Sequence, residues 1–264
     1  MAEGDVGWWG LAASLILIAI TLGISLWRRL ELERDVIVAV VRAAAQLLAV
    51  GYALGLVIIP EEPRENVGFA WAWLVFMVVF AAWTVSRRAP EVPGVFRLAL
   101  AALTTSTVVT VAVIFGFGIF PPETRTIIPI GGMMVGNAMS STVVAGRRIL
   151  AEFSEKRPDV EARLALGQSW QEASRPSLRA ALRTGMTSQI ETTKAVGLVF
   201  LPGAMTGLIL AGVEPVDAVM VQAAIMFLIL GAVAINVVVI GSGVTKRLFT
   251  DDHRLVRIAR SREP

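Results

Sequence analysis

Seven apolar stretches, separated by short polar segments, dominate this sequence and restrict what it can fold into. Each is at least about as long as the roughly 20 residues that a helix needs to cross the hydrocarbon core of a bilayer, and the seventh is longer. Hydrophobic residues make up 55% of the 264 residues and charged residues 17%, whereas a soluble domain is roughly one quarter charged. The stretches cover residues 8–27, 36–59, 67–85, 96–120, 127–149, 195–213 and 216–244.

This pattern predicts an all-α, polytopic integral membrane protein with about seven transmembrane helices. We expect a single domain over residues 1–264, located in the cell's inner (plasma) membrane as a multi-pass protein. The net charge of +3 and the pI near 9.9 do not call for nucleic acid as a partner. Basic residues beside apolar stretches are explained by membrane topology. Cysteine is absent, which excludes disulfides and thiolate metal ligands.

The positions of lysine and arginine predict the orientation, because these residues are retained on the cytoplasmic side of a membrane. Nearly all of them follow the first, third, fifth and seventh stretches, whereas the other connections hold only Arg64 and Arg125. The N-terminus is therefore expected outside the cell and the C-terminus inside. The long polar insert at residues 151–185 is then cytoplasmic.

The sequence of the insert predicts two short helices that are joined at a glycine. Residues 160–166 place Val160 and Leu164 one helical turn apart, and Gly167 falls where a helix commonly ends in a left-handed residue. A second helix is expected over residues 170–182. Such a compact projection suits a cleft on a partner protein. The alternative is an amphipathic hairpin that rests on anionic lipid through Arg175, Arg179 and Arg183.

The segment Glu161 to Gly167 resembles the E-A-A-x-x-x-G signature in the cytoplasmic loop of ABC-importer permeases, with Arg163 in place of the second alanine. In those permeases the loop docks on the subunit that hydrolyses ATP. The resemblance implies an ATPase-docking set in this chain: Glu161, Ala162, Arg163, Gly167 and Glu172. The chain has no G-x-x-x-x-G-K-[ST] phosphate loop. It is therefore expected to be no enzyme and to hold no cofactor, with ATP and Mg on the partner subunit.

The fifth stretch is the most polar of the seven and is the candidate translocation path. The polar and thioether side chains proposed to line this path are Met134, Asn137, Met139, Ser140 and Ser141. Polar groups that share one face of a membrane helix should point to protein or water. Interhelical hydrogen bonding by small polar residues is an equally open reading.

Glycine and proline mark two further features. Glycine pairs four residues apart, at 51/55, 132/136 and 203/207, favour close helix packing, either within the bundle or in a homodimer. Pro202 and Gly203 fall inside the sixth stretch, where proline removes a backbone donor and breaks a helix. We expect a hinge there.

Four runs, in this order and spacing, resemble the FetB family of ABC-transporter permeases over nearly the full length: RAAAQLLAVGYALG, PIGGMMVGNAMSSTVVAGRR, EARLALGQSWQEA and VGLVFLPGAMTGLILAG. Bacterial members are implicated in iron export with a FetA-type ATPase, and similar plant proteins are linked to aluminium tolerance. The resemblance implies a permease that exports iron or a related metal cargo and works as a homodimer with two ATP-binding subunits. A metal site is not identified, since the only histidine, His253, lies in the tail.

Two other classes compete with this reading. An ATP-independent ion-coupled carrier or channel would normally place a titratable carboxylate at membrane depth, and no stretch holds one deep inside. An intramembrane hydrolase would need a histidine within the membrane beside a serine nucleophile, and none is there.

Overall fold

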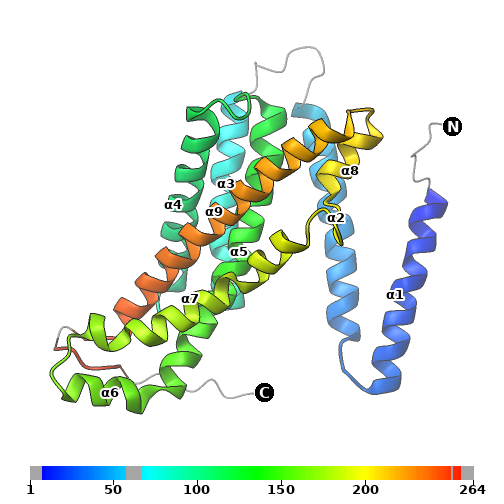
Figure 1. Ribbon diagram of the computed structural model, residues 1–264. Coiled ribbons are helices and arrows are strands. Elements are labelled where there is room, and N and C mark those ends of the chain that lie inside the picture. The colour runs from blue at the N-terminus through cyan, green and yellow to red at the C-terminus, as the bar shows by residue number, and fades with distance from the viewer. Residues whose placement is uncertain (1–7, 58–66, 251, 257–264) are drawn as a thin grey trace. The chain divides into compact units, whose positions relative to one another are not determined.

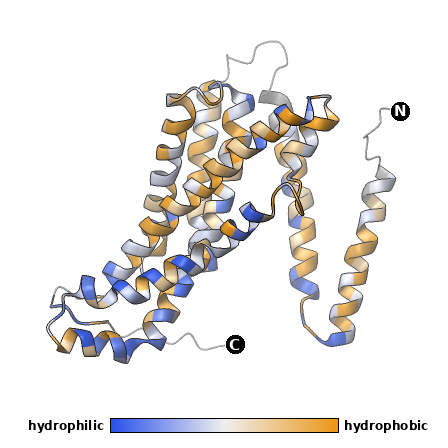
Figure 2. Ribbon diagram, in the orientation of Figure 1, coloured by the Kyte–Doolittle hydropathy of each residue, from blue (hydrophilic) through white to orange (hydrophobic). Residues whose placement is uncertain are grey.

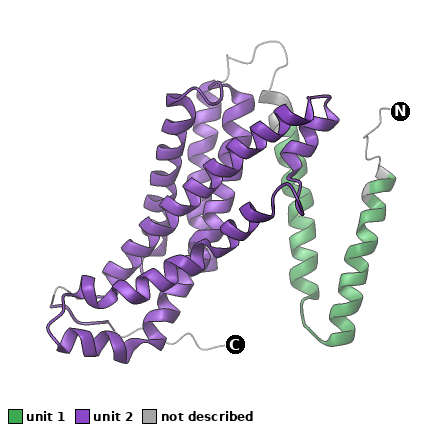
Figure 3. Cartoon of the chain, in the orientation of Figure 1, with its two compact units in different colours: residues 1–63 green, residues 64–264 purple. Residues whose placement is uncertain are grey.

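The computed structural model describes residues 8–57, 67–250 and 252–256. Over these residues the chain forms nine α-helices and no sheet (Figure 1). Contacts divide the chain into two compact units, residues 1–63 and residues 64–264 (Figure 3). The two units are described separately, and the single domain expected over residues 1–264 stays a prediction.

Unit 1 is a pair of apolar helices joined by a tight turn, α1 (Trp8–Arg28) and α2 (Glu33–Val57). The turn is fixed by one serine: Ser25 Oγ donates to Glu33 Oε1 at 2.6 Å and accepts from the Leu32 N–H at 3.2 Å. Most side chains of both helices are exposed, as expected for surfaces that face lipid. The two helices correspond to the first and second predicted spans.

Unit 2 is a bundle built around its two longest helices, α5 and α9, which pack against each other. Helix α3 packs on α4 and α5, and α7 packs on both α5 and α9. The bounds of its helices are α3 Val67–Arg88, α4 Val95–Gly116, α5 Thr124–Glu155, α6 Arg157–Ala165, α7 Trp170–Ala195, α8 Gly203–Leu210 and α9 Pro215–Arg247.

Three helices of unit 2 finish at the same end, which we call the basic end. Arg147 near the end of α5 pairs with Glu91 at 2.8 Å and donates to the Arg88 carbonyl at the end of α3. Arg247 at the end of α9 donates to the Pro93 carbonyl at 3.3 Å. Polar residues gather at this end and continue along α7, and apolar residues predominate over the long helices of the bundle (Figure 2). This is the arrangement of a membrane bundle whose basic side chains lie at one interface.

Five helices of the described chain are long and apolar enough to cross a membrane: α2, α3, α4, α5 and α9. They match the second, third, fourth, fifth and seventh predicted spans. The fifth is longer than predicted, because α5 runs for 32 residues and carries the chain beyond the basic end.

The sixth predicted span, residues 195–213, is wrong as a helix. Helix α7 ends at Ala195, residues 196–202 are non-helical, and α8 has 8 residues, which is roughly 12 Å of helix and too short to cross a bilayer. Gly197 has a φ of +91°, and Pro202 disfavours helical geometry in the residue before it. Since α5 runs past the basic end and α9 also finishes there, the chain returns across unit 2 through α7, residues 196–202 and α8 together (Figure 1).

Candidate functional site

The polar insert folds into two helices that meet at a sharp turn (Figure 1). Helix α6 carries a proline in its first turn, where the missing N–H is not needed. It ends in a Schellman motif: the Gly167 N–H donates to the Leu164 carbonyl at 3.0 Å, and the Gln168 N–H to the Arg163 carbonyl at 3.2 Å. Gly167 has a φ of +85°, so the predicted glycine cap is confirmed. We call residues 157–172 the knob.

The start of α7 is held by a capping box. Ser169 Oγ accepts from the Glu172 N–H at 3.4 Å, and the Glu172 carboxylate accepts from the Ser169 N–H at 3.0 Å. The hydrogen bonds from the Ser169 backbone and hydroxyl hold the pKa of the Glu172 carboxyl below its ordinary value. The S-x-x-E spacing that signals this box is present in the sequence, and our sequence reading assigned Glu172 only to docking. Its docking role stays a prediction, while its capping role is a feature of the structure.

The residues of the E-A-x-x-x-x-G motif lie on the surface of the knob. Glu161 Oε1 accepts from Arg157 Nε at 2.6 Å, one helical turn away, and the Glu161 side chain is still 51% exposed. Ala162, Arg163 and Gly167 are exposed as well. Beside them Leu166 is 83% exposed, so an apolar side chain stands next to the charged pair and is available for contact with a partner protein. This assignment of Leu166 was not made from the sequence.

The knob packs against residues 248–250 and 252–256, which we call the C-terminal hairpin. Phe249 pairs there with Leu255 in an antiparallel bridge. The Phe249 ring lies 5.6 Å from the Trp170 ring and 5.8 Å from the Phe153 ring, between centroids.

Polar contacts extend this support. Arg157 donates to the backbone carbonyls of Leu255 and Val256 at 3.2 and 3.3 Å. The Trp170 N–H donates to His253 Nδ1 at 3.2 Å. The sole histidine of the chain is therefore part of a structural contact.

A buried carboxylate fixes the base of the knob. The side chain of Glu152 on α5 is 1% exposed and forms ion pairs with Arg148 at 2.7 Å and with Lys156 at 3.2 Å. A buried carboxylate without partners would be costly. Arg148, one helical turn before Glu152, and Lys156, one turn after it, supply the partners that this buried carboxylate needs. The sequence reading did not single out Glu152.

The candidate path residues of the fifth span divide between two sides of α5. Asn137 and Ser140 are exposed, and each donates to a carbonyl of its own helix, Met133 at 2.8 Å and Gly136 at 3.3 Å. Ser141 and Met139 are half-buried. The structure thus leaves Asn137 and Ser140 open to a path and keeps their hydrogen-bond donors satisfied within the helix.

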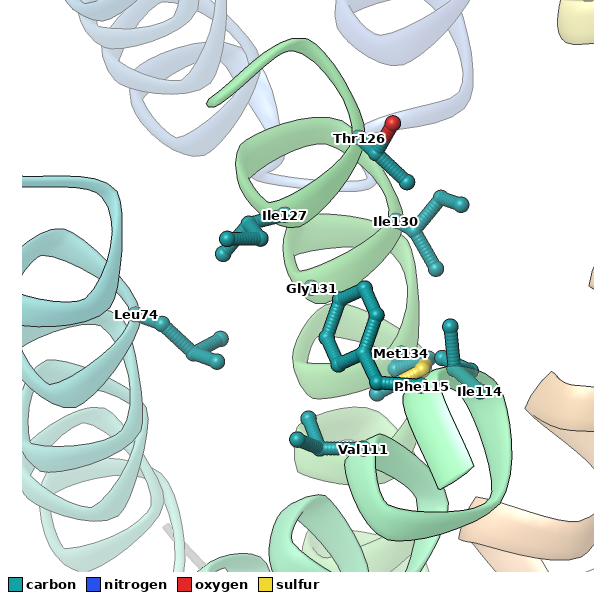
Figure 4. A pocket seen from close by; sticks show the side chains of 9 residues that line it. All are labelled: Leu74, Val111, Ile114, Phe115, Thr126, Ile127, Ile130, Gly131 and Met134. Carbon is teal, nitrogen blue, oxygen red and sulfur yellow. The ribbon is translucent and has the colours of Figure 1, made fainter. Parts of the chain in front are cut away.

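Met134 lies apart from this group. It is buried and lines a small apolar cavity between α3, α4 and α5, together with Leu74 and Phe115 (Figure 4). This surrounding is that of a core side chain, so Met134 does not share a surface with Asn137 and Ser140.

Pro202 and Gly203 lie where the helix is interrupted, as predicted, but in a different role. Pro202 is buried and stands at the N-cap of α8, so it begins a helix and does not break one from within. The interruption precedes it, and the Gly197 N–H bonds to the Phe200 carbonyl there at 3.0 Å. Hinge motion at this point stays a prediction.

In the part of the chain that the structure describes, no three His, Cys, Asp or Glu side chains gather in a way that could hold a metal ion.

Comparison with known proteins gives a match over almost the whole chain. The profile of an uncharacterised protein family, UPF0014, matches residues 8–249. The UPF0014 membrane protein STAR2 of Oryza sativa subsp. japonica is 34% identical over 85% of this chain and 77% of its own length. The UPF0014 membrane protein YjkA of Bacillus subtilis is 32% identical over 93% of this chain and 96% of its own.

A further relative has a name that states an activity. The probable iron export permease protein FetB of Escherichia coli is 29% identical, over 93% of each chain. No solved structure gives a significant match.

Proposed function

Because this chain belongs to the UPF0014 family of membrane proteins, we propose that it is the membrane-spanning permease subunit of an ATP-driven ABC transporter, energised by a separate ATP-binding subunit. The name of the FetB relative supports a permease, and it favours iron or a related metal as exported cargo. The chain then works as one of two permease copies with two ATP-binding subunits, a FetA-like protein being the expected type.

The knob is the observation that carries this proposal. It is a rigid, exposed projection beyond the basic end, capped at both sides of its turn and supported by the C-terminal hairpin. Its exposed surface combines a charged pair, Arg157 and Glu161, with the apolar side chain of Leu166. A cleft on an ATP-binding subunit would bury Leu166 at its centre and meet the charges at its rim.

The orientation agrees with this role. The basic residues in the last turns of α3 and α9, together with Arg147 and Arg148 of α5, lie at the basic end, which is cytoplasmic in the proposed orientation under the positive-inside rule. The N-terminus is then outside, the C-terminus inside, and the knob on the side where ATP is available.

The deciding experiment is co-purification with the candidate ATP-binding subunit in mild detergent. Wild type should retain the subunit, and Glu161→Lys should lose it, because the substitution turns an attractive charge into a repulsive one and frees Arg157. Asp159→Lys is the matched control, since Asp159 is an exposed acid on the same helix outside the motif. If Glu161→Lys retains as much of the ATP-binding subunit as Asp159→Lys does, docking through Glu161 is contradicted.

The alternative is an ATP-independent ion-coupled carrier or channel. It predicts transport by the purified chain alone in proteoliposomes without ATP. Transport that appears only when the ATP-binding subunit and ATP are added excludes this alternative.

A further inference from the structure

Helix α7 carries a continuous polar stripe on its exposed face. Successive residues are four, four, four, four and three apart, so each lies about one helical turn from the next and the row winds gradually around the exposed side of α7. All of them are exposed: Arg175, Arg179, Arg183, Thr187, Glu191 and Lys194. The opposite face, with Ala181, Gly185 and Gln189, is buried. We call the six exposed residues the α7 stripe.

The buried face fixes the depth of the stripe in the bundle. A Cβ at Gly185 would lie 3.0 Å from the Ala145 Cβ and 3.3 Å from a Val237 methyl group. A Cβ at Gly241 would collide with Leu182. Helix α7 is therefore in tight contact with α5 and α9, the two most central apolar spans, and runs antiparallel to both.

This register places the end of the stripe deep in the membrane. Lys194 is nine residues beyond Gly185, about 14 Å further along the helix. Because α9 runs antiparallel to α7, the residue of α9 at the level of Lys194 lies nine positions before Val237. This residue is Leu228, near the middle of α9. Arg183 lies at the level of Arg147 by the same count on α5. The stripe thus extends from the basic end to roughly the middle of the bilayer.

The chemistry of the stripe is incompatible with lipid at that depth. Glu191 and Lys194 form an ion pair at 2.9 Å, and their side chains are 62% and 66% exposed. Charged groups within a membrane face a bundle interior or a water-filled cavity, since contact with hydrocarbon costs several kcal/mol. By contrast, the exposed residues of α9 at the same levels are apolar, Phe227 and Val238 among them.

We propose that the α7 stripe lines the water-filled path of the cargo, which enters at the basic end as a hydrated polar or charged solute and meets the Glu191–Lys194 pair near the middle of the membrane. The inference rests on the proposed permease function and deepens it, because it assigns the path to α7. The row Arg175, Arg179 and Arg183 forms the entrance; none has an acidic partner within the described residues.

Single-cysteine labelling tests this directly, because the natural chain has no cysteine. Thr187→Cys and Lys194→Cys place one thiol each on the stripe. Val238→Cys and Phe227→Cys each place one within about three residues of the matching level on the apolar surface of α9. Phe227 is 68% exposed, similar to the 66% of the Lys194 side chain. The probe is a charged, membrane-impermeant methanethiosulfonate, applied to the chain in phosphatidylcholine and phosphatidylglycerol vesicles.

The stripe variants should react at least about tenfold faster than their controls, because the reactive thiolate forms only where water solvates it. Equal rates at matched positions would overturn the inference. So would stripe cysteines that resist the probe and form disulfides between two copies of the chain, since this would show that a second copy covers the stripe.

Labelling needs neither the ATP-binding subunit nor cargo, so it fails independently of the proposed function. If the chain retains the ATP-binding subunit but the stripe cysteines are not labelled, the proposed permease function stands and the proposal that α7 lines the path is overturned. Labelling of the stripe without retention would keep the path and remove the ABC assignment.

Discussion

Asn236 of α9 donates its side-chain amide to the backbone carbonyl of Ala138 on α5 at 3.1 Å. The same amide contacts Thr142 Oγ1, and Asn236 is fully buried. The two longest helices of unit 2 are thus joined by a polar contact in an otherwise apolar interface. In such surroundings an amide fixes which residues of two helices lie side by side.

Asn236→Ala should therefore destabilise unit 2 by about 1 kcal/mol, the size of an interhelical hydrogen bond in membranes. Unfolding in mixed detergent and SDS micelles measures this change. Asn137→Ala is the matched control, because the Asn137 amide bonds only to its own helix and is exposed. Equal effects of both substitutions would show that the α5–α9 contact is not what stabilises the interface.

Gly185 should tolerate no larger side chain. Its missing Cβ is what lets α7 approach Ala145 and Val237, and overpacking costs about 1–3 kcal/mol. Gly185→Val should lower the unfolding midpoint and separate α7 from α5. Gly207→Val on α8 is the control, since nothing lies within 4 Å of a Cβ there, and it should leave the midpoint unchanged.

Phe249→Ala should loosen the knob without altering its exposed surface. The ring is 8% exposed and contacts both Phe153 and Trp170, so its loss is expected to cost about 3 kcal/mol. Limited proteolysis in the turn between α6 and α7 should become faster. Leu166→Asp should instead leave the rate of proteolysis unchanged and abolish retention of the ATP-binding subunit, because it alters the exposed surface and not the aromatic contacts.

The capping box at the start of α7 predicts a pH dependence. The folded state holds the pKa of Glu172 below its ordinary value, so the folded state binds fewer protons and its stabilisation is complete above the ordinary glutamate pKa of roughly 4.3. The stabilisation is lost as the pH falls from there through the lowered pKa. Unfolding midpoints should therefore drop more in wild type than in Glu172→Gln over this acidic range. Parallel curves would contradict the contribution of the box.

The apolar stretches predicted most of the helices because a span of about 20 residues is a strong signal. The Gly167 cap was predictable for a similar reason, since few residues other than glycine take a left-handed conformation. The sixth span failed because hydropathy does not distinguish a helix from an apolar segment bent at Gly197 and Pro202.

The glycine pairs show a different limit. Gly136, Gly203 and Gly207 have open space where a Cβ would stand, so the four-residue spacing does not mark close packing within unit 2. Gly51 has open space within unit 1, and the surroundings of Gly55 lie outside the described residues. The tight contacts involve Gly131, Gly185, Gly241 and Gly243. Only the fold decides which glycine face meets another helix.

The α7 stripe was missed for a related reason. Its arginines were assigned to a cytoplasmic hairpin ending near residue 182, because the polar sequence gave no sign that the helix continues to Ala195 beside two membrane spans. The Asn236 contact was missed because isolated amides in a largely apolar helix of 33 residues do not show by their spacing which helix they face.

The C-terminal hairpin has a consequence for biosynthesis. Arg157 and Val256 touch across 99 residues of sequence, so the ribosome must complete α7, α8 and α9 before the knob receives its support. A chain interrupted before Phe249 would insert most of its spans and still present a knob without its aromatic base. In the proposed complex, docking of the ATP-binding subunit is thereby tied to synthesis of the last helix.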